Sequence, residues 1–80
     1  MISKYLMKLP IVSGMKVVKA LTKQGFVQKG REGSHVTLEK RTEEGVFRTT
    51  VPLHKELGKG LLLDIMRQSG YTREEFLKIL

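Results

Sequence analysis

Apolar residues near the start of the chain recur at the spacing of a helix. Ser13 is a residue type that caps helix N-termini, and Gly25 is one that often follows the last helical residue. These signals predict a helix over residues 14–24. At about 100° per residue, one arc of this helix holds Val17, Val18 and Leu21. The opposite arc holds Lys16, Lys19 and Lys23.

The middle of the chain has the two-residue alternation of strands. We predict three short strands, over residues 26–29, 35–39 and 46–51. Glycine-containing turns separate them at residues 30–33 and 42–45, with Gly45 placed to take a positive φ. Pro52 ends the third strand because it cannot donate a ladder hydrogen bond. Consecutive short strands of this kind form an antiparallel meander.

Two further helices are predicted after the connection over residues 53–59. The first covers residues 60–69 and stops at Gly70. Its inward residues are expected to be Leu61, Leu62, Ile65 and Met66. Thr72 and Glu75 form a capping-box pattern that opens a last short helix. The order α-β-β-β-α with a short extra C-terminal helix predicts an α+β fold, with helices on one face of a three-stranded antiparallel sheet and the other face free.

Length and composition narrow the class of protein. Eighty residues, of which 40% are hydrophobic, make one domain over residues 1–80 and exclude a multi-domain enzyme. The chain has no cysteine, which excludes disulfides and thiolate chemistry, and its two histidines alone cannot form a structural metal site. No apolar run approaches the roughly 18 residues of a membrane span. We therefore expect a cytoplasmic protein with no membrane partner.

The net charge of +7 is concentrated in the first part of the chain. Residues 1–31 hold seven basic side chains and no acidic one, whereas residues 32–80 hold eight of each. A local positive field of this kind attracts polyanions, meaning RNA, DNA, an acidic membrane surface or an acidic protein partner, and does not by itself choose among them. The alternative for the lysine face is an ordinary solvated helix surface.

His35 is the strongest candidate for chemistry. It lies on the polar face of a predicted strand, and histidine side chains generally gain and lose a proton near neutral pH. The residues before it, Lys29, Arg31, Gly33 and Ser34, offer cations and backbone amides that suit a phosphate. The alternative is an unremarkable surface histidine.

A second group of candidates follows the third predicted strand. His54 can contact phosphate or substrate, although a loop histidine bound to backbone or water explains it equally well. Lys55 and Lys59 approach the start of the second predicted helix, where free amides favour anions. Solvated lysines are again the alternative.

The order and spacing of these features resemble one known family. The shared elements are Leu9-Pro10, Ser13-Gly14, Gly25-Phe26, Gly33-Ser34-His35, Val51-Pro52-x-His54, Lys59-Gly60-x-Leu62 and Ile65-x-x-Gln68-x-Gly70. Together they resemble the HicA toxins of toxin–antitoxin systems. The resemblance implies a double-stranded-RNA-binding-domain-like fold, messenger-RNA endoribonuclease activity, a catalytic histidine at His35 and a HicB-type antitoxin partner. One departure is the acidic turn at Glu43-Glu44, which is not expected to touch RNA.

The residues themselves point to metal-free cleavage, without a cofactor. No pair of acids or histidines has metal-ligand spacing, but RNA supplies its own nucleophile in the 2′-hydroxyl. We expect His35 to move the proton, while Lys29, Arg31 and the Gly33–Ser34 amides stabilise the transition state. The leaving-group acid can be a water, a lysine or His54.

The rival hypothesis is a non-catalytic module for double-stranded RNA. In that case the basic residues would only grip phosphates. These residues are Lys16, Lys19, Lys23, Lys55 and Lys59.

Overall fold

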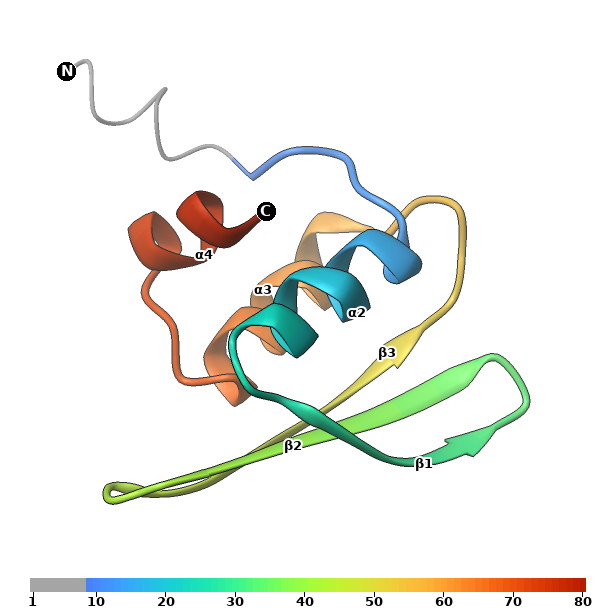
Figure 1. Cartoon of the computed structure of the whole chain (residues 1–80). Helices are drawn as coiled ribbons and strands as arrows, with labels where there is room; N and C mark the ends of the chain where they lie inside the picture. Colours follow the sequence, from blue (N-terminus) through green and yellow to red (C-terminus); the bar gives the residue numbers. More distant parts are fainter. Residues whose placement is uncertain (1–8) are drawn as a thin grey trace, which may run out of the picture.

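A computed structural model describes residues 9–80 and has the predicted order of elements (Figure 1). The elements are helix α2 (Gly14–Lys23), strands β1 (Val27–Glu32), β2 (His35–Thr42) and β3 (Gly45–Pro52), and helices α3 (Lys59–Gln68) and α4 (Arg73–Ile79). This sequence of elements confirms the α-β-β-β-α order with a short extra helix. None of the helices in this part of the chain is long and apolar enough to cross a membrane.

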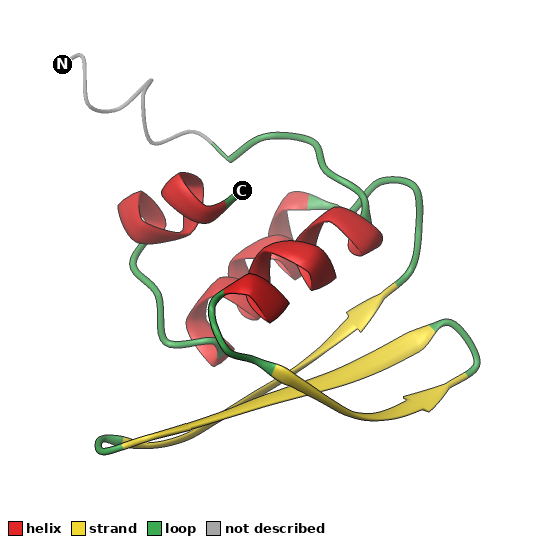
Figure 2. Cartoon of the chain, in the orientation of Figure 1, coloured by secondary structure: helices red, strands yellow, loops and turns green. Residues whose placement is uncertain are grey.

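The three strands form one antiparallel sheet in the order β1-β2-β3. Figure 2 shows all the helices on one side of the sheet. Val36 and Leu38 of β2 and Val51 of β3 are buried toward the helices. Thr37 and Thr50, each next to one of these residues in sequence, pair with each other and meet on the other side. We call that other side the open face.

The first hairpin differs from the prediction. Strand β1 continues to Glu32, and the turn is Gly33–Ser34 rather than residues 30–33. Gly33 has a φ of 59°, as a two-residue hairpin turn requires at its first position. Gly30 lies inside the ladder instead, next to a bulge at Lys29 where the register shifts.

The predicted capping residues are confirmed. The Ser13 hydroxyl accepts from the Lys16 amide at 3.1 Å, and Thr72 with Glu75 forms a capping box. Gly25 and Gly70, which follow the first two helices, both have positive φ.

The prediction that Leu61 is buried is wrong. Leu62, Ile65 and Met66 of α3 are buried, but Leu61 is 37% exposed. Leu61 falls about 40° outside the arc that the other three define at 100° per residue, so the apolar stripe of α3 is narrower than expected.

A single cluster of buried side chains joins the sheet to all three helices. Its fully buried members include Leu21 of α2, Leu38 of β2, Ile65 of α3 and Phe76 of α4. The core thus fixes the helical layer on the sheet and leaves the sheet ends and the open face to carry polar groups.

Candidate active site

His35 is the first residue of β2 and lies at one end of the sheet. It pairs with Glu32 on β1 and with Pro52 on β3. Its side chain is exposed, and it alternates with the buried Val36 and Leu38, which places it on the open face as predicted.

His54 lies beside His35 because three backbone hydrogen bonds hold the connection after β3. The Leu53 amide donates to the Ser34 carbonyl at 2.7 Å. The Gly14 amide donates to the His54 carbonyl at 2.9 Å, and the Leu57 amide donates to the Val12 carbonyl at 2.9 Å. These hydrogen bonds therefore hold together the end of the sheet, the connection after β3 and the start of α2.

The two imidazole rings are close neighbours. Their centroids are 6.3 Å apart and their planes meet at 74°, so the edge of one ring faces the other. Both side chains are exposed, which leaves them open to a ligand from solvent. One phosphodiester group can contact both rings, and two imidazoles can serve as a proton acceptor and a proton donor in the same reaction.

Gly14 makes this arrangement possible. A Cβ atom at this position would lie 1.9 Å from the carbonyl oxygen of Pro52, which no side chain can occupy. The close approach of α2 to the end of β3 therefore requires glycine. Sequence reasoning treated Gly14 as the first helical residue and as part of the Ser13-Gly14 element, but not as a point of close approach. The signal for that role was a glycine at a position where most other residues favour a helix more.

The β1–β2 turn offers further polar groups near His35. Within residues 9–80, no hydrogen bond uses the amides of Gly33 or Ser34. Arg31 donates from Nε to the Gly33 carbonyl at 2.9 Å, so its guanidinium is held at the turn. These groups belong to the turn directly before His35, although the ladder pairs Arg31 with Val36, whose side chain lies on the helix side of the sheet.

Comparison with known families identifies the chain. Residues 14–71 match a family described as the HicA toxin of bacterial toxin–antitoxin systems. The chain belongs to the HicA toxin family. The matched region contains His35, His54 and every element from α2 to α3. No curated protein matches the sequence.

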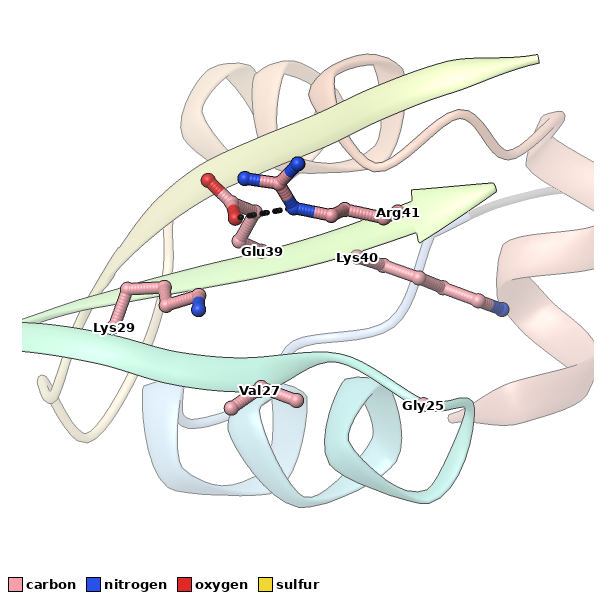
Figure 3. Close-up of a pocket in the computed structure, with 6 residues that line it drawn as sticks. All are labelled: Gly25, Val27, Lys29, Glu39, Lys40 and Arg41. Carbon is pink, nitrogen blue, oxygen red and sulfur yellow. Dashed lines mark ion pairs between the residues drawn. The ribbon is translucent and has the colours of Figure 1, made fainter. Parts of the chain in front are cut away.

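Lys29 of this HicA family member lies close to Glu39. It occupies the β1 bulge, away from the pairing of Glu32 with His35, and lines a hollow with Val27, Glu39 and Arg41 (Figure 3). Lys29 thus lies three residues before Glu32, the partner of His35, and beside Glu39.

The other basic candidates are divided between two regions. Lys16, Lys19 and Lys23 are exposed on α2 in the helical layer, opposite the arc that packs on the sheet. Lys55 and Lys59 are exposed on either side of Gly58, in and just after the connection that carries His54. Lys4 and Lys8 lie outside the described residues.

Sequence reasoning also missed Glu39. It occupies the open face of β2 but is only 4% exposed, because Arg48 and Arg41 pair with it there. The Arg48 hydrogen bond lowers the pKa of Glu39 below its ordinary value, against the opposing effect of burial; Arg41 and Lys29 add to the lowering.

Within residues 9–80, no group of three or more His, Asp or Glu side chains is arranged to hold a metal ion.

Proposed function

We propose that this HicA family member is a metal-independent endoribonuclease that cleaves messenger RNA, with His35 as its catalytic histidine. The observation that carries the proposal is the closeness of the His35 and His54 rings, whose centroids lie 6.3 Å apart at an exposed end of the sheet. Two adjacent imidazoles supply the proton acceptor and the proton donor that RNA cleavage needs, and RNA supplies the nucleophile.

In the proposed reaction, His35 accepts the proton of the 2′-hydroxyl as the 2′-oxygen attacks the adjacent phosphorus. A bond forms between the 2′-oxygen and phosphorus, and the bond from phosphorus to the 5′-oxygen breaks. His54 in its protonated form donates a proton to the departing 5′-oxygen. The products are a 2′,3′-cyclic phosphate and a 5′-hydroxyl, and no co-reactant is consumed.

The groups around the two histidines have electrostatic roles in this proposal. The Gly33 and Ser34 amides and the Arg31 guanidinium stabilise the charge that develops on the phosphoryl oxygens. Lys55 and Lys59 bind phosphates on the His54 side, while the α2 lysines attract RNA from solution. The acidic Glu43-Glu44 turn, at the opposite end of β2 from His35, takes no part.

We further propose that a HicB-type antitoxin controls the enzyme by covering the His35 end of the sheet. Membership of a toxin–antitoxin family supports a protein partner, and the positive field would speed the approach of an acidic one. Apolar anchors and acidic side chains of the partner would then meet the site together. Hydrogen exchange should slow over residues 26–38 when the antitoxin is added; protection confined to residues 72–80 would show inhibition at a distance.

The decisive experiment uses unstructured RNA with single 2′-deoxy substitutions. Cleavage should stop only at the substituted linkages, because those linkages lack the nucleophile, and cleavage of the others should continue in excess EDTA at constant ionic strength. Loss of all cleavage in EDTA would contradict metal independence. Binding of RNA without products would instead support the non-catalytic double-stranded-RNA-binding module.

A further inference from the structure

A buried carboxylate lies on the face of the sheet that no helix covers. Glu39 is 4% exposed, although neighbouring positions of the open face, such as Val27 at 57% and Val46 at 54%, are largely exposed. The ladder places Glu39 between Val27 of β1 and Arg48 of β3. A buried charge is costly unless it is paired, so its partners explain why it is tolerated.

Each carboxylate oxygen of Glu39 holds a different arginine. Arg48 donates from Nε at 3.1 Å and from Nη2 at 2.5 Å to Oε2. Arg41 places its Nε 3.6 Å from Oε1. The arginine side chains remain 65% and 78% exposed, and neither makes another side-chain hydrogen bond within residues 9–80. The carboxylate thus anchors two guanidinium groups whose remaining donors face solvent.

Lys29 brings a third cation to the same place. Figure 3 shows Lys29 reaching from β1 toward the side of β2 where Arg41 meets Glu39. The hollow between them is about 240 Å³, smaller than the roughly 300–1,000 Å³ of small-molecule sites. Lys29 and Arg41 line this shallow hollow beside Glu39, and Arg48 reaches the same carboxylate from β3 without lining the hollow. Cations grouped in this way suit a single charged group of a longer ligand better than an enclosed small molecule.

We propose that Lys29, Arg41 and Arg48 form a phosphate-binding subsite for single-stranded RNA on the open face, with Glu39 as the residue that positions the arginines. This inference rests on the proposed function, because it extends the RNA path from His35. His35, Thr37, Glu39 and Arg41 alternate along β2, so they share one face. From His35 to Arg41 the strand covers about 20 Å at 3.3–3.4 Å per residue, so the subsite binds nucleotides beyond those at the cut.

Arginine chemistry favours RNA as the occupant. A guanidinium presents several donors in a fixed fork that matches phosphate oxygens, and anchoring by Glu39 lowers the entropy lost when the ligand binds. The excess of positive charge complements a polyanion. The exposed Val27 and Val46 belong to the same face and would serve a protein partner, which the experiment distinguishes.

The test measures binding of an unstructured RNA oligonucleotide to full-length protein that carries His35→Ala to prevent cleavage. Arg41→Gln and Arg48→Gln should each weaken binding about tenfold and reduce the slope of log affinity against log salt by about 0.7. The matched control is Arg67→Gln, since Arg67 is 68% exposed and paired with Asp64 on α3, away from the sheet. This control should leave binding unchanged.

Glu39→Gln tests whether Glu39 positions the two arginines or acts only through its negative charge. The substitution makes the protein more positive, so charge alone would strengthen RNA binding. If Glu39 positions the arginines, binding should instead weaken about threefold, with circular dichroism unchanged. Stronger binding would overturn the positioning role. If Glu39→Gln unfolds the protein, the exposed Arg41→Gln variant still decides the subsite.

Two outcomes separate this inference from the proposed function. If the wild type cleaves RNA, and the Arg41, Arg48 and Arg67 variants all bind RNA with the same affinity, the subsite is overturned and the proposed enzyme activity stands. Weaker binding by the two open-face variants, together with no cleavage by the wild type, would support the subsite and overturn the enzyme. Equal RNA binding with weaker antitoxin binding would assign the open face to a protein partner and overturn the RNA subsite.

Discussion

The histidine end of the sheet and the lysine face of α2 are both polar surfaces, but they are built differently. His35 and His54 meet because the β1–β2 turn, the connection after β3 and the start of α2 are bonded to one another. Lys16, Lys19 and Lys23 come from one helix, and within residues 9–80 none of them forms an ion pair.

This difference separates two tasks. Proton transfer requires groups held within hydrogen-bond reach of the reacting atoms, so it needs several segments fixed together. Electrostatic attraction needs only the sign and density of charge, which three exposed lysines on one helix supply. Changes at the histidine end should therefore be nearly all-or-none, and changes on the lysine face should be graded.

The largest expected effect is loss of catalysis in His35→Ala. Removing a general base should slow RNA cleavage by about 10²- to 10⁴-fold, and growth inhibition should disappear with it. The melting temperature should stay close to that of the wild type, because the side chain is exposed and contributes little packing. A variant that still cuts, or one that unfolds, would show that His35 is not the catalytic histidine.

Gly14→Ala should break the histidine end without touching either imidazole. The new Cβ would meet the Pro52 carbonyl, so the connection that carries His54 must move. We expect a loss of about 1–3 kcal/mol in the free energy of unfolding, measured by urea denaturation, and slower cleavage.

The matched control is Gly60→Ala in the first turn of α3, where an added Cβ meets nothing within 4 Å. Alanine favours a helix, so this variant should be as stable as the wild type or up to about 1 kcal/mol more stable. Equal effects at the two glycines would show that the close approach at Gly14 is not required.

His54→Ala should change the pH dependence of cleavage more than it changes RNA binding. With both histidines the rate should rise and then fall with pH, because one must be neutral and the other protonated. Without His54 the fall at high pH should disappear and the maximum rate should drop, while a water serves as a slower donor. An unchanged profile would assign the leaving-group proton to another group.

Replacing Lys16, Lys19 and Lys23 together with glutamine should give a graded effect. Each lost phosphate contact should lower the slope of log affinity against log salt by about 0.7 for single-stranded RNA, while the cleavage rate of bound RNA stays unchanged. Salt titration of RNA binding measures the slope. The same slope as the wild type would reduce these lysines to ordinary surface charge.

The smallest effect concerns Glu39 and acid stability. Its pKa is lowered in the folded protein, so its stabilising contribution is present above the pKa of the unfolded chain and is lost as pH falls through the folded value. Melting curves of wild type and Glu39→Gln should therefore differ at neutral pH and converge in acid. A constant difference across this range would show that the ion pairs with Arg48 and Arg41 contribute nothing to folding.

The order of elements was readable from the sequence because it depends on local interactions. Ser13, Gly25 and the Thr72–Glu75 capping box act within a few residues of themselves, and all three were predicted with the roles the structure shows. The alternation of β2 likewise placed His35 on the polar face, since successive side chains of a strand point to opposite sides.

Contacts between distant segments were decided only by the tertiary structure. The bulge at Lys29 depends on how β1 pairs with β2, and the burial of Glu39 depends on Arg48 from the next strand. His54 reaches His35 only because Gly14 lets α2 approach Pro52. Local pattern determines which residue types are available and on which face, whereas strand register and the packing of helix on sheet determine which of them meet.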